Sequence, residues 1–319
     1  MAENSKIEWT HHTFNPWRGC TKVSEGCRNC YAETLSGRNP GTLGVWGPNG
    51  TRVVASESMW KEPVKWDKKA KAAGERHRVF CASLADVFEG PATMPAAAWD
   101  AVTQARKRLG QLILDTPNLD WLLLTKRPEN VTAIAADMWV RFGGPTVPLP
   151  PNVWVGASVE NQQAADERIP HLLKVPAAVR FLSCEPLLGA VDIREHLNGD
   201  STGRETGGPQ GWQPGPAVDW VIVGGESGHG ARPMHWHWAH SLRDQCQAAG
   251  VPFHFKQWGE WVSGVKSPMD VQKGPGQYRP GCYHDFDAHS MALKIGKKDA
   301  GRKLDGRTWD EVPTTGVAK

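Results

Sequence analysis

The sequence predicts an α/β fold, a full or partial parallel β/α barrel, and two observations lead to this prediction. Six apolar runs recur along the chain, and each of them ends in polar residues. Their apolar portions are continuous rather than alternating, which is typical of strands buried on both faces of a parallel sheet. Helix-like patterns lie between several of these runs, and strands alternating with helices indicate crossover connections. The number of such units favours a barrel over an open doubly wound sheet.

The expected elements follow one another along most of the chain. Strands are expected at residues 78–88, 120–128, 152–160, 179–188, 219–228 and 252–261. Helices are expected at residues 95–112, 129–140, 160–174 and 235–249, and the last of them stops at Gly250. Residues 37–74 show weak periodicity and form an excursion, whereas the Gly/Pro-rich residues 197–218 are interpreted as a surface insertion.

The domain organisation follows from the same patterns. Residues 1–261 are expected to form the barrel, with an N-terminal cysteine loop and the excursion, and residues 262–319 a loop-rich C-terminal extension. No apolar run is long enough to cross a membrane. The start, MAENSKIEWTHH, lacks the apolar region of a secretory signal, so we expect a cytoplasmic protein with reduced thiols. A net charge of +3 does not by itself predict nucleic-acid binding.

A cysteine cluster near the start indicates metal chemistry. The segment N-P-W-R-G-C-T-K-V-S-E-G-C-R-N-C-Y-A-E has the spacing C-x6-C-x2-C, and its cysteines are Cys20, Cys27 and Cys30. A structural zinc needs a fourth ligand, for which the candidates are His11, His12, Cys81 and Cys184. A [4Fe–4S] cluster held by three cysteines would instead leave one iron open. Spacing alone leaves both metals open, with unrelated free thiols as a third interpretation.

Several motifs carry a resemblance to known proteins. N-P-W-R-G-C followed by C-x-x-C-Y-A is similar to the N-P-Y-x-G-C…C-x-Y-C-Y-A segment of radical SAM enzymes of the spore photoproduct lyase-like branch. Residues 84–88 resemble the T-D-P-Y element of that branch, and Thr125-Lys126 its T-K element. Together with V-G-G-E-S-G and F-K-Q-W-G-E, they resemble a phage-associated three-cysteine-motif family of unknown function over about residues 6–261. The chain departs from the usual C-x3-C-x2-C spacing and has Asn29 where an aromatic residue is usual.

This resemblance implies a function. It implies a radical SAM-like barrel whose [4Fe–4S] cluster binds Cys20, Cys27 and Cys30, with S-adenosyl-L-methionine as the second cofactor and a 5′-deoxyadenosyl radical as the reactive species. It also implies an electron donor such as a flavodoxin or ferredoxin, and a nucleic acid or nucleotide as the substrate. Two alternatives remain, a zinc-stabilised nucleic-acid-binding module and a non-catalytic phage accessory protein that binds a partner.

Polar residues at the carboxyl ends of the expected strands are the remaining site candidates, because function gathers there in β/α barrels. The candidate cofactor-binding residues are Tyr31, Asp86, Ser158, Glu160, Gly224, Gly225 and Glu226. The candidate catalytic residues are Lys126, Cys184 and Glu185.

Most of the candidate cofactor residues have an expected role, and several also have an ordinary alternative. The resemblance implies that Tyr31 contacts adenine. Glycines 224 and 225 let the backbone approach a ligand or form a tight turn, and Glu226 accepts from the ammonium of S-adenosylmethionine. Ser158 and Glu160 bind ribose hydroxyls or the methionine end, or else begin a helix with Asn161 as its cap.

The catalytic candidates have similar alternatives. Lys126, with Arg127, holds a carboxylate or phosphate, or lies on the surface. Cys184 donates a hydrogen atom to a substrate radical, or packs as a small apolar residue. Glu185 acts as an acid or base, or pairs with Lys126 or Lys256.

Overall fold

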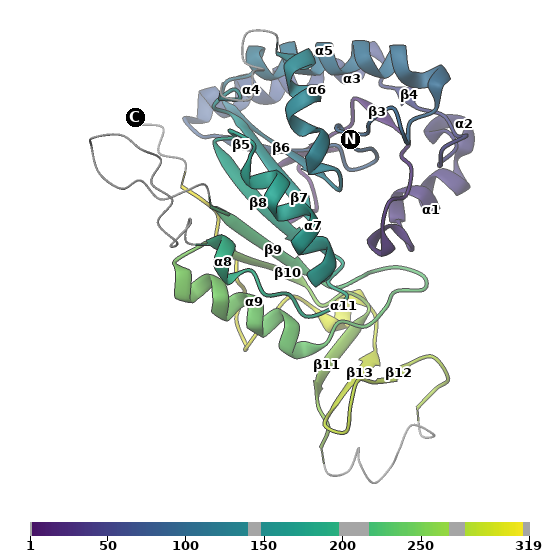
Figure 1. The fold of residues 1–319 in the computed structure, drawn as a ribbon, viewed down its shortest axis with the longest axis vertical. Helices are drawn as coiled ribbons and strands as arrows, with labels where there is room; N and C mark the ends of the chain where they lie inside the picture. Colours follow the sequence, from purple (N-terminus) through teal and green to yellow (C-terminus); the bar gives the residue numbers. More distant parts are fainter. Residues whose placement is uncertain (1, 140–147, 198–216, 268–277, 315–319) are drawn as a thin grey trace. The chain divides into compact units, whose positions relative to one another are not determined.

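The computed structural model describes residues 2–139, 148–197, 217–267 and 278–314, and the chain divides into two compact units (Figure 1). Unit 1 contains Met1–Ala157, Arg168–Phe181 and Thr314–Lys319, and unit 2 contains Ser158–Glu167 and Leu182–Pro313. Residues on both sides of the predicted boundary at 261 belong to unit 2. Nearly all of the predicted insertion at 197–218 lies outside the described residues.

The main sheet has the strand order β1-β2-β5-β6-β7-β8-β9-β10. Its strands are β1 (Ala2–Glu3), β2 (His12–Phe14), β5 (His77–Cys81), β6 (Leu119–Thr125), β7 (Val153–Ser158), β8 (Val179–Cys184), β9 (Trp220–Gly224) and β10 (Phe253–Gln257). β1 pairs antiparallel with β2, and the seven strands from β2 onward form the parallel sheet. The α/β class and the partial form of the parallel barrel are therefore confirmed. All six predicted strands are present, and each ends before its predicted polar end.

The strands are buried on both faces, as their continuous apolar patterns predict. Every residue of β7 is buried, and so is every residue of β9. Within unit 1, Gly156 of β7 leaves space for the ring of Phe181, because a Cβ atom there would lie 2.3 Å from that ring. The fully buried Trp121 of β6 donates its indole N–H to Thr116 Oγ1 at 3.0 Å. Trp121 therefore fills part of the core of unit 1 with its polar atom satisfied where the strand begins.

Helices cover the strands of unit 1. They include α3 (Glu57–Trp60), α4 (Glu62–Ala73), α5 (Trp99–Asp115) and α6 (Val131–Met138), and α5 and α6 lie side by side in Figure 1. The short helices η2 (Ala96–Ala98) and η3 (Pro128–Asn130) precede α5 and α6. Helix α5 turns a regular apolar face inward, with Val102, Leu109 and Ile113 buried. Helix α4 lies inside the predicted excursion, which is therefore partly helical.

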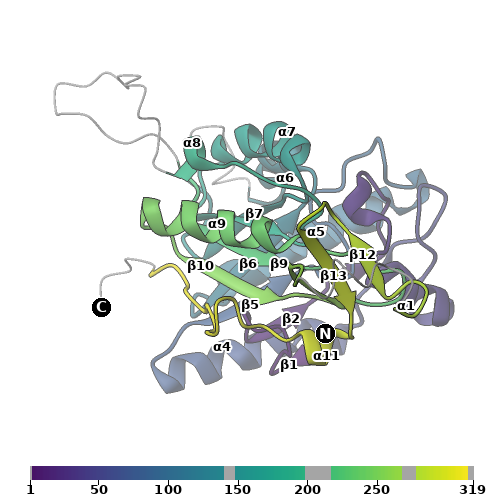
Figure 2. The same cartoon turned by 90° about the horizontal axis from the view of Figure 1, so that it is seen from below.

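Two further helices begin at capping side chains. The side chain of Asn161 accepts a hydrogen bond from Ala164 N at 2.9 Å, at the start of α7 (Gln162–Leu173). The alternative in which residues 158–161 lead into a helix capped by Asn161 is thus confirmed. Helix α9 (Trp236–Ala249) is capped by His235 and ends at Gly250, whose φ is 67°. It packs against β9 and β10 (Figure 2), and the short α8 (Arg194–Leu197) packs against it.

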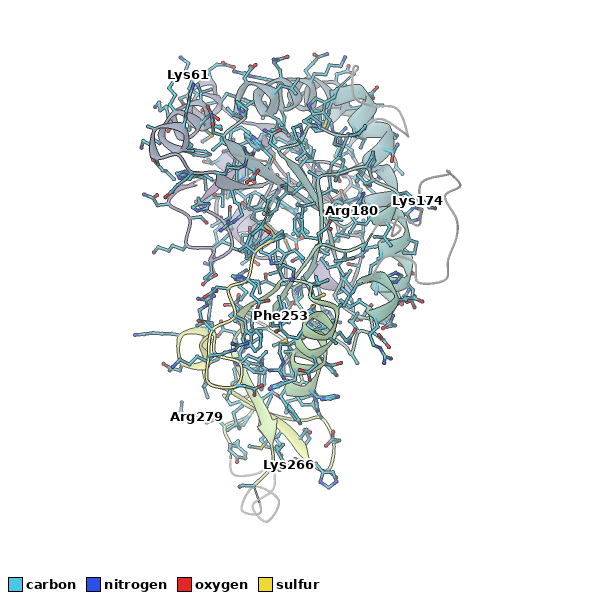
Figure 3. The ribbon with its side chains drawn as sticks, turned by 90° about the vertical axis from the view of Figure 1, so that its left-hand side faces the viewer. Lys61, Lys174, Arg180, Phe253, Lys266 and Arg279 are labelled. Atoms are coloured by element: carbon cyan, nitrogen blue, oxygen red, sulfur yellow. The ribbon has the colours of Figure 1, made fainter. Side chains whose placement is uncertain are left out.

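A second, smaller sheet lies in unit 2 and includes part of the predicted loop-rich extension. Its antiparallel strands are β11 (Trp261–Val265), β13 (Ser290–Lys294) and β12 (Tyr283–Asp285), in that order. Trp261, Ala292 and Ala231 form its core, and Phe286 packs against them. Lys266, at the end of this sheet in Figure 3, forms an ion pair with Asp285 at 2.5 Å. The one-turn helix α11 (Lys297–Ala300) follows β13.

None of the helices in the described parts of the chain is long and apolar enough to cross a membrane.

Candidate functional site

The cysteine segment follows β2 and is attached to the loop after β5. Asn15 Oδ1 accepts from Leu84 N at 2.7 Å, and Gly19 N donates to Leu84 O at 3.0 Å. Gly19 has a φ of +115°, and a Cβ atom there would lie only 2.2 Å from Thr51 O. Glycine is therefore required immediately before Cys20, because another residue would strain the backbone and collide with Thr51. Thr51 leads into β4 (Val53–Val54), which pairs with β3 (Trp17–Arg18).

The three cysteines are free thiols on one short stretch of chain. Cys27 ends the single-turn helix η1 (Glu25–Cys27), and Cys30 precedes the first turn of α1 (Tyr31–Arg38), which α2 (Pro40–Leu43) follows. Burial raises the pKa of Cys20 to about 12, and the charge of Asp86 acts in the same direction, against that of Arg127. Burial also raises the pKa of Cys30, although backbone N–H groups in the first turn of α1 oppose that effect.

The donor set fits a metal cluster in kind, although the described residues form no ready-made metal site. Three thiols are the ligands that iron–sulfur clusters and zinc prefer. The charge of Cys27 acts on Cys30, whereas the charges acting on Cys20 come from Asp86, Arg127 and Glu89. Among the described residues, no group of three or more His, Cys, Asp and Glu side chains is arranged to hold a metal ion. Whether Cys20, Cys27 and Cys30 bind a cluster therefore stays a prediction.

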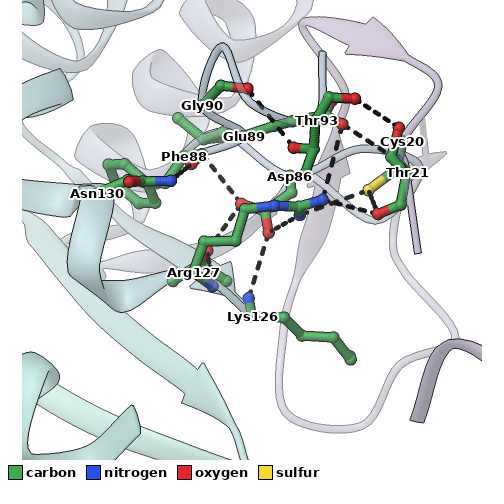
Figure 4. A network of polar contacts seen from close by, with 12 residues as sticks. Cys20, Thr21, Asp86, Phe88, Glu89, Gly90, Thr93, Lys126, Arg127 and Asn130 are labelled. Atoms are coloured by element: carbon green, nitrogen blue, oxygen red, sulfur yellow. Dashed lines mark hydrogen bonds and ion pairs between the residues drawn. The ribbon is translucent and has the colours of Figure 1, made fainter. Parts of the chain in front are cut away.

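A buried network of charges lies beside Cys20 (Figure 4). Arg127 donates from Nη2 to Thr21 O at 2.7 Å and from Nη1 to Asp86 Oδ2 at 2.8 Å, and the same Nη1 lies 3.8 Å from Cys20 Sγ. Glu89 accepts from Thr21 N at 3.1 Å. The peptide groups of Thr21 are thus held on both sides by side chains from the loops that follow β5 and β6, which fixes the backbone next to Cys20.

Arg52 completes this network from within the predicted excursion. Its Nε and Nη2 atoms donate to the two carboxylate oxygens of Glu89, at 2.8 and 2.7 Å, and both side chains are fully excluded from solvent. Nη2 also donates to Thr21 Oγ1 at 2.9 Å, and that hydroxyl donates to Thr93 O at 2.8 Å. A two-point pair of this kind fixes direction as well as distance.

Asp86, a predicted cofactor-binding residue, has a positioning role in the network. Its Oδ1 accepts from Thr125 Oγ1 at 2.8 Å and from Phe88 N at 2.9 Å. Its Oδ2 accepts from Lys126 N at 3.2 Å in addition to Arg127. Four hydrogen bonds satisfy this buried carboxylate, so Asp86 connects the loop after β5 with the end of β6.

The other predicted residues of unit 1 lie near the cysteines. The positive charge of Lys126 lowers the pKa of Cys30, so the two groups are electrostatically linked. Tyr31 is 57% exposed and donates its hydroxyl to Ser83 O at 2.6 Å, which ties α1 to the loop after β5. The structure therefore brings Cys20, Asp86 and Lys126 into one region of unit 1.

The remaining predicted residues belong to unit 2. Ser158, Glu160 and Cys184 are buried, and burial raises the pKa of the Cys184 thiol. Leu188 N donates to Glu160 O at 2.7 Å, which joins the chain after β8 to the segment before α7. A hydrogen-atom donor role for Cys184 and a ligand role for Ser158 and Glu160 stay predictions.

The chain after β9 makes a close backbone crossing. A Cβ atom on Gly225 would lie 1.9 Å from Trp258 O, so the glycine is needed for that approach. Glu226 forms a two-point pair with Arg232, with Nε to Oε2 at 2.9 Å and Nη2 to Oε1 at 2.7 Å. This carboxylate is therefore already matched by a cation. Binding of an ammonium group by Glu226 stays a prediction.

Glu185 pairs with Lys256, one of the two partners expected for it. Lys256 Nζ lies 2.6 and 2.8 Å from its carboxylate oxygens, and Gln257 Nε2 donates to Oε1 at 3.4 Å. Sequence reasoning missed the roles of Arg52, Glu89 and Thr21 in unit 1. Glu89 carried a weak signal, because it follows the expected strand of residues 78–88, whereas Arg52 carried none.

Comparisons with known proteins identify a family. No functionally curated protein matches the chain. Two solved structures of spore photoproduct lyase variants, one with a cysteine replaced by serine and one with a tyrosine replaced by phenylalanine, align with TM-scores of 0.43 and 0.41. Each is 13% identical, and each alignment covers 91% of this chain and 70% of the other. Both TM-scores lie below 0.5, so the assignment rests on the family match alone. That match spans residues 4–313, and the chain belongs to the family described as "Protein of unknown function (DUF5131)".

Proposed function

We propose that this chain is a radical SAM-type iron–sulfur enzyme that acts on a nucleic acid or nucleotide in the reducing cytoplasm. The observation that carries the proposal is the placement of three free thiols on one short segment, attached to the carboxyl ends of two parallel strands. Catalytic groups gather at this end of the strands in β/α barrels. The motif resemblance around the cysteines supports the same chemistry.

Cys20, Cys27 and Cys30 would hold a [4Fe–4S] cluster with one open iron, with S-adenosyl-L-methionine as the second cofactor. When bound, these groups supply one-electron cleavage of a carbon–sulfur bond and a carbon radical that abstracts hydrogen. The contribution of this chain is to hold the cysteine ligands in position. Arg127 and Glu89 fix the peptide groups of Thr21 beside Cys20, and the guanidinium of Arg127 favours the thiolate form of that cysteine.

A reducing partner is part of the proposal. An electron donor such as a flavodoxin or ferredoxin would reduce the cluster. Lys126 lies where its charge reaches Cys30, so it would attract an anionic group bound next to the cysteines.

The test begins with anaerobic reconstitution of the full chain with ferrous iron and sulfide. We expect iron and labile sulfide on the protein, visible absorption, an electron paramagnetic resonance signal on reduction, and 5′-deoxyadenosine once S-adenosylmethionine is added. The Cys27→Ala variant should show neither the bound iron and sulfide, nor the absorption, nor the resonance signal, nor 5′-deoxyadenosine. Cys282→Ala, a half-buried cysteine of unit 2, is the matched control and should lose none.

Two results would overturn the proposal. One zinc per chain without iron, together with salt-dependent binding to DNA or RNA, would establish the zinc-stabilised binding module instead. Failure of both metals to bind would leave the accessory role, in which substitution of the cysteines does not change the biological effect.

A further inference from the structure

Unit 2 holds a polar cluster at the ends of β8 and β10 to which the proposed reaction assigns no ligand. It consists of Glu185, Lys256 and Gln257. The side chains of Lys256 and Gln257 both donate hydrogen bonds to the Glu185 carboxylate. The side chains of Glu185 and Lys256 are 19% and 16% exposed, so the cluster is reachable from solvent on one side.

A bulge in β10 builds this cluster. Consecutive side chains of a strand normally point to opposite faces, yet Lys256 and Gln257 both reach Glu185. The pairing with β9 explains this, because Phe255 lies opposite Val223 while Gln257 lies opposite Gly224, which leaves Lys256 as the extra residue. A bulge redirects side chains at a cost in pairing, and such features concentrate next to binding sites.

Gly224 and the chain after Glu185 keep the carboxylate in place. A Cβ atom on Gly224 would lie 3.3 Å from Glu185 Cδ, so a larger residue would press on the carboxylate. Leu187 N donates to Gly224 O at 3.0 Å, which fixes the backbone two residues beyond Glu185. The acid is therefore held rigidly against β9.

Gln257 contributes an acceptor that lacks a partner. Its side chain is buried, with only 3% of the residue exposed, and Oε1 accepts no hydrogen bond from any residue that the structure describes. Rotating the amide by half a turn would bring Oε1 against the Glu185 carboxylate, two acceptors together, so Nε2 faces the acid. A buried carbonyl oxygen without a donor is destabilising. An external donor would remove that penalty.

The hydrogen-bonding capacity that remains defines the ligand. Glu185 keeps one acceptor position and Gln257 Oε1 keeps two. The ammonium of Lys256 and the amide nitrogen of Gln257 each keep one N–H. An anion such as phosphate would be repelled by the carboxylate and the carbonyl oxygen, and a cation would be repelled by Lys256. A neutral pair of adjacent hydroxyls supplies two donors for the two acceptors and an oxygen for Lys256.

We propose that Glu185, Lys256 and Gln257 form a binding site for a neutral sugar with vicinal hydroxyls, in which one hydroxyl donates to Gln257 Oε1. This site lies entirely within unit 2 and needs no metal. Sugar binding can therefore be measured on the protein without iron. Absence of sugar binding can also be distinguished from failure of the cysteines to bind a cluster.

The test is equilibrium binding of methyl β-D-ribofuranoside and its 2-deoxy analogue to the full chain, by calorimetry or ligand-observed NMR. For a ligand of this size we expect a Kd on the order of 1–10 mM for the riboside. The deoxy analogue should bind at least about fivefold more weakly, because it lacks one of the two paired hydroxyls. This comparison needs no variant.

Gln257→Met then tests the amide. It keeps the approximate length of the side chain and removes Oε1 together with the hydrogen bond from Nε2 to Glu185, so the preference for the riboside should disappear. The melting temperature should stay level or rise, because the unpaired buried oxygen is removed as well. Gln163→Met, an exposed residue of α7, is the matched control and should keep the preference. Equal binding of the two sugars, absence of riboside binding, or a preference that survives in Gln257→Met would each overturn the proposal.

Discussion

The guanidinium of Arg52 and the carboxylate of Glu89 form a two-point ion pair from which solvent is excluded. The two residues are 37 positions apart, and they meet over the backbone of Thr21. A buried pair that also holds a loop makes the conformation of that loop depend on two charges.

Removing one member of this pair should be costly. We expect Arg52→Met to lower the free energy of unfolding by about 3–5 kcal/mol, because Glu89 then keeps a buried charge without its principal partner. Chemical denaturation of the full chain measures this. Lys65→Met, which removes an exposed pair with Glu62, is the control and should leave the denaturation midpoint unchanged.

The pair should also be coupled. The double variant Arg52→Met with Glu89→Leu should lose less stability than the sum of the two single variants. Strict additivity would show that the pair contributes nothing as a unit.

Two glycines of the cysteine region should respond in opposite ways to alanine. Gly19→Ala should destabilise the chain by about 1–3 kcal/mol, since its φ of +115° and the close Thr51 O leave no space for a methyl group. Gly37→Ala, in helix α1 with nothing within 4 Å, should stabilise it by up to about 1 kcal/mol. Thermal melts of the two variants test this, and destabilisation by both would contradict the assigned backbone of α1.

A cluster of histidines in unit 1 should make the fold sensitive to acid. His12 Nε2 lies 3.1 Å from His77 Nδ1, and the ring of His11 stacks on that of His77. Burial first, and then neighbouring positive charges, lower the pKa values of His11 and His12 to about 4. The unfolded chain takes up protons near pH 6.5 and the folded chain does not. The stability that these neutral histidines contribute is therefore fully present above pH 6.5 and is lost as the pH falls towards 4.

The effect should be larger for His12, which is buried with 3% of the residue exposed, than for the partly exposed His11. We expect a loss of about 1–3 kcal/mol per histidine between pH 6.5 and 4. His12→Gln should flatten the dependence of the melting temperature on pH, whereas His237→Gln, an exposed residue of α9, should leave its slope unchanged. An unchanged slope in His12→Gln would contradict the prediction.

Cys20 should react slowly with alkylating reagents in the folded chain. Because its pKa is raised to about 12, the thiolate fraction should still be rising at pH 10, with no plateau. Peptide mass spectrometry after timed iodoacetamide treatment measures this rate for Cys20 alone. The same chain in urea is the reference, and there the rate should level off near the ordinary cysteine pKa. A plateau at pH 8 in the folded chain would refute the assigned burial.

Continuous apolar runs predicted the strands well, because burial on both faces leaves a strong pattern, as in β7 and β9. Helix α4 was missed for a physical reason. Its buried residues are Pro63, Trp66, Asp67 and Ala70, so the inward face holds a charge and a proline instead of a regular apolar stripe. Asp67 is buried because it accepts hydrogen bonds from Asn118, a contact that no local pattern contains.

The candidate site was predictable only in its chemistry. The three cysteines and the strand-end residues Asp86 and Glu185 could be selected by type and spacing. Their partners could not, since Arg52 reaches Glu89 through the course of a loop. The bulge at Lys256 depends on pairing between two strands, and the sequence of β10 alone does not contain it.

The amide proton of Thr21 lies against Glu89 inside the buried network. Hydrogen–deuterium exchange at this position requires Thr21 to separate from Glu89, whose carboxylate Arg52 holds in place. The amide beside Cys20 should therefore exchange far more slowly than the amides of an exposed loop.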